Sequence, residues 1–160
     1  MGLRFVDQYA VVEGLAPRTP SSSTPDYVCL KNVAWMTAII HVDNATTVTG
    51  SAITLKQATA VAGTSEKALG FAKAYRNIDT AASDALAEFT VTSDTFTTDA
   101  TDNKNLLYVI EIDPTTLDTN NGFDCVRVGT GNATAAVLNV VYVLKMKAQD
   151  GPVAPSAIVD

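Results

Sequence analysis

Apolar and polar residues alternate along much of the chain, which is the pattern of half-buried β-strands. The alternation is clearest over residues 51–60, where Ile53 and Leu55 alternate with Thr54 and Lys56. Threonine is frequent throughout, and its branched Cβ suits a pleated sheet better than a helix. Further strands are predicted over residues 3–12, 27–43, 88–96, 105–112, 122–129 and 135–146.

Residues 60–86 carry the weakest pattern. Their Ala, Glu and Lys content, at residues 66–69 and 81–87, would also suit short helices. We expect short strands and loops there. The whole chain then has about eight strands and no regular alternation of strands with helices, which predicts an all-β sandwich.

Turn signals separate the predicted strands. Asp113-Pro114 predicts a short turn or a one-turn helix, because Asp caps a helix and Pro is tolerated at its first position. Asn121-Gly122 is a strong turn signal, since both residues tolerate a positive φ. The run Gly129–Asn132 lies between two apolar segments and predicts a hairpin tip. Residues 27–43 are expected to form one long strand, with a bend near Asn32.

The N-terminal part differs in composition from the rest. Residues 16–25 hold three prolines and three serines, which favour an extended linker over a strand or a helix. We therefore divide the chain into an N-terminal strand or arm with its linker (1–26), a sandwich domain (27–147) and a C-terminal tail (148–160). A chain of 160 residues is the size of a single domain.

Charge excludes two classes of partner. The formal net charge is −6, and only 18% of the residues are charged. Nucleic-acid binding depends on cations that neutralise phosphates, so nucleic acid is not an expected partner. The same argument speaks against anionic membranes, and no apolar segment approaches the ~20 residues that span a bilayer. The N-terminus has no secretory signal, so we expect synthesis and folding in the cytoplasm.

Candidate catalytic chemistry is sparse. His41 is the sole histidine, and Asp43 lies two residues further on. A Ser-His-Asp site would also need a nucleophile in a recognisable context, and no G-x-S-x-G sequence is present. We expect a structural or solvent-facing histidine, no catalytic residue and no enzyme activity.

Metal and cofactor sites are not expected either. The loop after Asp118 places Gly122 one position early for an EF-hand, and no Glu follows at the twelfth position. Cys29 and Cys125 lie in separate apolar segments without C-x-x-C spacing, so we expect two free thiols and leave open whether they meet. The remaining aspartates of these loops are expected to cap turns. They are Asp94, Asp99, Asp102, Asp113 and Asp124.

Aromatic residues bear on carbohydrate binding, which uses exposed Trp or Tyr as a platform for sugar rings. Trp35 lies inside an apolar segment, so we expect it in the core. The five tyrosines are scattered over separate segments. A carbohydrate-binding sandwich therefore stays an alternative rather than the first choice.

Several stretches resemble a known family. They are residues 53–59 and 63–71, then 107–113, 117–118 and 122–128, and the Ala- and Val-rich last strand that ends at 142–144. Together these patterns, over residues 27–147, resemble the jelly-roll capsid decoration (cement) proteins of tailed bacteriophages. The tail over residues 148–160 departs from the family pattern.

The resemblance implies a jelly-roll-like β-sandwich of about eight strands with an N-terminal arm. It also implies a non-enzymatic virion protein without cofactors, which binds the major capsid protein on the outer surface of the phage head. Such a protein is expected to associate with itself as a homotrimer or homodimer. The alternatives are another phage structural module, from a tail or fibre, and a carbohydrate-binding module. The arm supplies the interface candidates: Leu3, Arg4, Phe5 and Tyr9.

Overall fold

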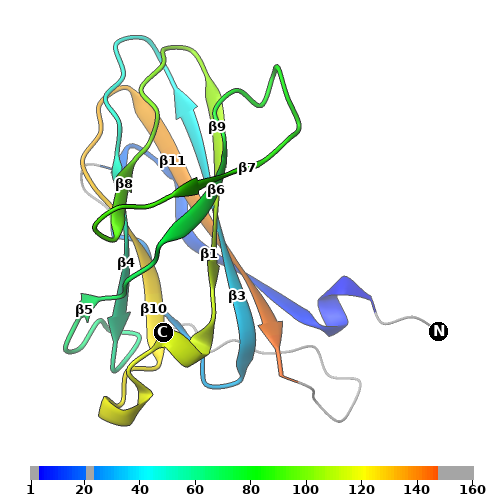
Figure 1. Cartoon of the computed structure of the whole chain (residues 1–160), viewed down its shortest axis with the longest axis vertical. Coiled ribbons are helices and arrows are strands. Elements are labelled where there is room, and N and C mark those ends of the chain that lie inside the picture. Colours follow the sequence, from blue (N-terminus) through cyan, green and yellow to red (C-terminus); the bar gives the residue numbers. More distant parts are fainter. Residues whose placement is uncertain (1–3, 21–23, 148–160) are drawn as a thin grey trace.

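The computed structural model describes residues 4–20 and 24–147, which form a sandwich of two antiparallel sheets (Figure 1). The six-stranded sheet has the order β1-β11-β3-β9-β6-β7, and the other sheet has the order β2-β10-β4-β5, with β8 also paired to β4. The strands are β1 (Tyr9–Arg18), β2 (Val28–Cys29), β3 (Val33–Asn44), β4 (Ala52–Ala58), β5 (Lys67–Ala68), β6 (Lys73–Asn77), β7 (Ala87–Thr90), β8 (Thr95–Thr97), β9 (Asn105–Ile112), β10 (Cys125–Thr130) and β11 (Ala136–Met146).

The strand order is that of a jelly roll. Without β6, β7 and β8, the eight remaining strands numbered along the chain are arranged 1-8-3-6 in one sheet and 2-7-4-5 in the other. This is the order that two interleaved Greek keys produce. The expected all-β sandwich of about eight strands is confirmed. The segment β6–β8 is an insertion: β6 and β7 extend the larger sheet, and β8 pairs with β4 of the smaller one.

The core lies between the two sheets and follows the alternation of the strands. In β3, for example, Met36, Ile40 and Val42 point inward and have no exposed surface. Tyr142 of β11 reaches across the core: its hydroxyl accepts a hydrogen bond from Val128 N–H of β10 (3.0 Å). The same hydroxyl donates to the carbonyl of Asp26 (3.1 Å), so one buried side chain links the two sheets.

The segment expected to be one strand over residues 27–43 is divided between the two sheets. β2 belongs to the smaller sheet and β3 to the larger one. Between them, Lys31 and Asn32 form a turn in which Val33 N–H donates to the carbonyl of Leu30 (3.1 Å). The bend expected near Asn32 is therefore the point at which the chain crosses from one layer to the other.

The N-terminal segment also differs from the expectation. Residues 9–18, expected in part as arm and in part as linker, form the edge strand β1, which pairs with β11 from Tyr9↔Lys145 to Arg18↔Leu138. Pro17 is tolerated there because an edge strand has one unpaired side, and the register shifts on either side of Leu15 absorb the irregularity. Residues 4–8 precede the sheet and include the 3-10 turn η1 (Phe5–Asp7).

Residues 60–86 contain the short strands β5 and β6 joined by loops, as expected. The helices in the described part of the chain are all short 3-10 helices. None of these helices is long and apolar enough to cross a membrane.

The turn predictions are confirmed at two of three positions. In η3 (Pro114–Thr116) the carboxylate of Asp113 accepts a hydrogen bond from Thr115 N–H (2.9 Å). Gly122 ends η4 (Thr119–Asn121) with a φ of 81°. The predicted hairpin at residues 129–132 is wrong, because β10 and β11 belong to different sheets and the turn connects the two layers.

Candidate binding surface

The solvent-facing side of the six-stranded sheet carries a broad set of apolar side chains. One row of register partners crosses all six strands, from Glu13 in β1 to Glu88 in β7. Between these two glutamates lie Val141, Ile39, Val109 and Tyr75. We call the apolar members of this side the apolar face: Val11, Trp35, Ile39, Tyr75, Leu107, Val109, Val137, Val141 and Val143.

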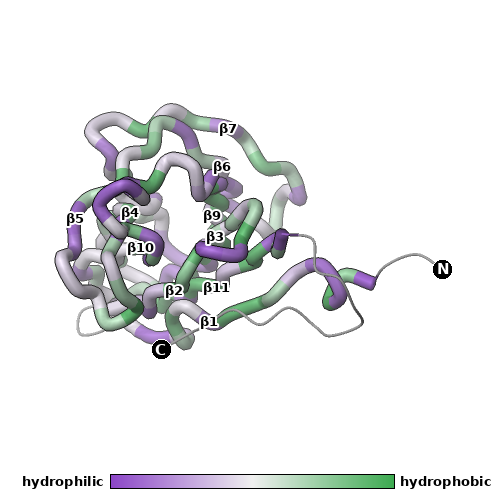
Figure 2. Tube along the Cα trace, turned by 90° about the horizontal axis from the view of Figure 1, so that it is seen from below, coloured by the Kyte–Doolittle hydropathy of each residue, from purple (hydrophilic) through white to green (hydrophobic). Residues whose placement is uncertain are grey.

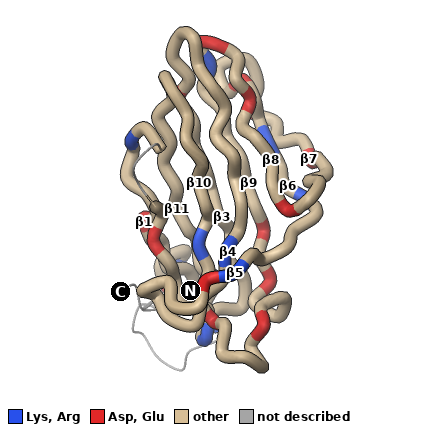
Figure 3. Tube along the Cα trace, turned by 90° about the vertical axis from the view of Figure 1, so that its left-hand side faces the viewer, with Lys and Arg blue, Asp and Glu red and all other residues tan. Residues whose placement is uncertain are grey.

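Several members of the apolar face are strongly exposed. Val11 has 57% of its surface accessible, Val137 40% and Trp35 38%. The long strands carry few charges along their length, and Figure 3 shows most Lys, Arg, Asp and Glu near strand ends and in loops. Exposed apolar side chains gathered on one sheet face make this face a candidate surface for a protein partner.

Trp35 lies on the apolar face and not in the core, so the sequence-based expectation is wrong. Met36, the next residue along β3, takes the inward position and is fully buried. The indole Nε1–H donates to the carboxylate of Glu111, which also accepts from the Thr37 hydroxyl (3.0 Å). Trp35 and Tyr9 line a hollow of about 400 Å³ at this end of the face.

Residues 4–8 project beyond the edge of the sheet and include both hydrophilic and hydrophobic residues (Figure 2). Arg4 and Asp7 form an ion pair (2.9 Å) that closes the turn η1, and Phe5 stacks on Tyr9 with ring centroids 4.7 Å apart. Phe5 is 53% exposed and Val6 is 54% exposed. Of the four interface candidates, Leu3 lies outside the described residues, and the other three belong to this projecting segment or to its junction with β1.

The outer face of the smaller sheet is different, because its charged side chains form ion pairs with one another. Glu66 accepts hydrogen bonds from Lys56 Nζ, from the Tyr27 hydroxyl and from Arg127 Nη2, each at 2.6 Å. Burial by itself raises the pKa of Glu66, but these three donors outweigh it and lower the pKa to about 2. Arg127 also lies over the ring of Tyr27, 5.2 Å from its centroid.

His41 and Asp43 lie exposed on the outer side of β3, next to the apolar face. The register partners of His41 are Asn139 and Leu107, so no nucleophile faces it from the neighbouring strands.

The loop aspartates mostly bind backbone N–H groups, as turn caps do. Asp94 accepts from Phe71 N–H, Asp99 from Thr101 N–H and Asp102 from Val48 N–H. Asp118 is different, because it forms an ion pair with Lys67.

The two cysteines, whose meeting was left open, are register partners in β2 and β10. Spacing along the sequence carries no signal for this contact, because it depends on how two strands far apart in the chain are paired.

Comparisons with known proteins identify no family. No family model matches the chain, and no curated protein matches it. Among solved structures, the chain is similar to the SPBc2 prophage-derived protein YomS, with 15% sequence identity and a TM-score of 0.44. The likeness covers 85% of this chain and 91% of that one. Neither a function nor a partner follows from a likeness of this size.

Proposed function

We propose that this chain is a structural protein of a tailed-phage particle, which binds the outer surface of the head shell as a homo-oligomer and stabilises it. The apolar face is the observation that carries the proposal, because it is a surface suited to protein neighbours. The sequence resemblance to capsid decoration proteins supplies the kind of particle and the major capsid protein as partner.

Two parts of the surface divide the contacts between them. The apolar face crosses the six-stranded sheet and includes exposed valines and Trp35, which suits contact between copies of one chain. The segment over residues 4–8 projects from the edge of the sheet with Phe5 and Val6 exposed, which suits insertion between capsid subunits. We assign self-association to the apolar face and capsid binding to this segment.

An oligomer is an effective cement because its copies bind together. Once one copy holds the shell, the next contact is intramolecular and requires little further loss of freedom. Modest contacts therefore add up to firm attachment. The net charge of −6 gives no attraction to packaged DNA, which agrees with an outer position.

Labelling of purified particles tests the proposal. Antibodies against this chain should decorate the whole head of the phage whose genome encodes it, at many copies per particle. Heads that lack the protein should lose DNA at a lower temperature than complete heads. Labelling at a single vertex or along the tail would replace the proposal with the tail or fibre alternative.

A second candidate function, glycan binding, is favoured by the position of Trp35. Its half-exposed indole and the ring of Tyr9 line a hollow on the apolar face, and aromatic rings of this kind stack against sugars. A glycan array with the wild type and Trp35→Ala tests it. Specific binding that the substitution removes would support glycan recognition, and an array without specific binding would exclude it.

A further inference from the structure

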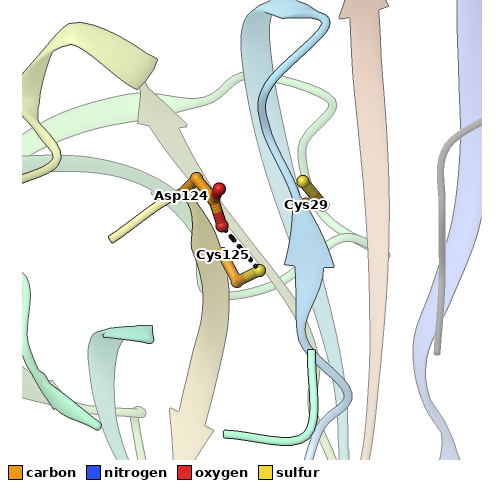
Figure 4. Close-up of side chains that lie close together, drawn as sticks. All are labelled: Cys29, Asp124 and Cys125. Carbon is orange, nitrogen blue, oxygen red and sulfur yellow. Dashed lines mark hydrogen bonds between the residues drawn. The ribbon is translucent and has the colours of Figure 1, made fainter. Parts of the chain in front are cut away.

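Cys29 and Cys125, the two cysteines of the chain, lie directly opposite each other in adjacent antiparallel strands (Figure 4). Leu30 N–H donates to the carbonyl of Asp124 (2.7 Å). Leu30 and Asp124, the next residues along the two strands, are therefore a hydrogen-bonded pair. Cys29 and Cys125 therefore occupy a non-hydrogen-bonded position, where cross-strand side chains approach each other most closely. Both thiols are free.

Both cysteines face the outer side of the smaller sheet. Their neighbours Val28 and Val126 are fully buried in the core, and alternation turns Cys29 and Cys125 the other way. Cys125 is only 2% exposed, whereas Cys29 is half-buried. The protein therefore covers Cys125, whereas part of Cys29 is open to solvent.

Asp124 places a carboxylate beside the two sulfurs. Its Oδ1 accepts a hydrogen bond from Cys125 Sγ (3.2 Å), and its Oδ2 forms an ion pair with Lys31 Nζ (3.0 Å). Lys31 therefore holds one oxygen and leaves the other turned toward the thiols. The two sulfurs and one carboxylate oxygen all lie within 4.8 Å of one another.

We propose that Cys29, Cys125 and Asp124 bind one thiophilic divalent cation of the Zn²⁺ type, with water as the fourth ligand. Two sulfurs at about 2.3 Å from a tetrahedral zinc lie roughly 3.8 Å apart, and the two sulfurs here lie within 4.8 Å of each other. The two thiols release their protons to solvent as the metal binds. Calcium and magnesium are disfavoured, because they require several oxygen ligands.

The Asp124 carboxylate is open to solvent on its other side. Asp124 and Lys31 line an open pocket of about 730 Å³.

A disulfide between Cys29 and Cys125 is the competing outcome. It would use the two sulfurs but would leave unexplained why Lys31 and Cys125 hold the Asp124 carboxylate over the thiols. The proposal is independent of the role in the phage head. Its structural consequence is local: the metal would tie β2, an edge strand of two residues, to β10.

Cobalt binding to the reduced full-length protein tests the proposal. Because the chain has two cysteines, any thiolate-to-cobalt charge-transfer absorption reports on this site alone. We expect this absorption to saturate at one Co²⁺ per chain, to disappear when Zn²⁺ is added, and to be absent in Cys29→Ser. Zn²⁺ should also raise the melting temperature of the wild type.

Asp124→Asn keeps both thiols and the shape of the side chain, so it tests the third ligand without a change in the core. Its metal affinity should fall roughly 10-fold or more, since even the loss of a supporting group has that effect. Absence of charge-transfer absorption in the reduced wild type would overturn the proposal. So would protein isolated without reductant that is lighter by two hydrogen atoms and binds no metal, because it would hold a disulfide instead.

Discussion

At the level of single residues, the outer side of the smaller sheet depends on Glu66. The pKa of this carboxyl is about 2 in the folded chain, against an ordinary value of 4.5. Because folding lowers the pKa, the ionised carboxylate stabilises the protein above pH 4.5, and this stabilisation is lost as the pH falls toward 2. With 29% of the side chain exposed, we expect a contribution of about 2 kcal/mol at pH 7.

Glu66→Gln should remove this contribution and leave the charge of Arg127 without its partner. Urea unfolding of the variant and the wild type should differ by about 2 kcal/mol at pH 7 and converge near pH 2. Glu13→Gln, at an exposed position of β1, is the matched control and should change the stability by less than about 0.5 kcal/mol. A constant difference between Glu66→Gln and the wild type from pH 7 to pH 2 would show that the carboxylate charge is not the cause.

Tyr142 is the residue whose hydroxyl joins the two sheets. Tyr142→Phe keeps the ring but leaves Val128 N–H and the Asp26 carbonyl without this partner. We expect a loss of about 1–3 kcal/mol in the free energy of unfolding, measured by urea denaturation. Tyr75→Phe, at a partly exposed position of β6, is the control and should cost less. Equal effects of the two substitutions would mean that the buried hydrogen bonds of Tyr142 contribute little.

At the level of elements, β1 and the residues before it have separate roles. Deletion of residues 1–8 removes the projecting segment but leaves all pairs between β1 and β11, so the melting temperature should stay within a few degrees of the wild type. Deletion of residues 1–18 also removes Leu15, which is 5% exposed, and uncovers the edge of β11. We expect the longer deletion to cost about 3 kcal/mol or more. Thermal unfolding compares the two, and equal stability would show that β1 is dispensable to the sandwich.

The strands themselves were largely predictable, because alternation is a local property of the sequence. The sheet to which each strand belongs was not. Residues 27–43 form one apolar run, and nothing in their pattern marks Lys31 and Asn32 as the crossing between layers. The glycines at 129 and 131 likewise indicate a turn without telling whether the next strand returns to the same sheet.

The same distinction limits what could be predicted of the candidate sites. Alternation places Trp35 and Met36 on opposite sides of β3, but both are apolar, so the inward member is chosen only by packing. Phe5 and Tyr9 could be chosen from the sequence as interface candidates, because a proline-rich segment follows these large residues. The approach of Cys29 to Cys125 could not be predicted, because strand register between distant segments depends on the complete fold.

At the level of the whole molecule, the apolar face should control self-association. Val11→Asp places a charge at its most exposed member, where the monomer loses little stability. Sedimentation velocity should show a dimer or trimer for the wild type and a monomer for this variant. Thr97→Asp adds the same charge at an exposed position of β8, on the other sheet, and should leave the oligomer intact. A wild type that stays monomeric at high concentration, or an oligomer that Val11→Asp does not weaken, would rule out the apolar face as the contact.

We propose above that this protein holds neighbouring proteins together on a phage head. The most direct measurement is binding of the fluorescently labelled chain to purified heads from which it has been removed, compared with the chain that lacks residues 1–8. We predict saturable binding of the wild type at many sites per head, and at least a tenfold weaker binding of the deletion at unchanged melting temperature. Failure of the wild type to bind such heads, or identical binding of both chains, would contradict the account.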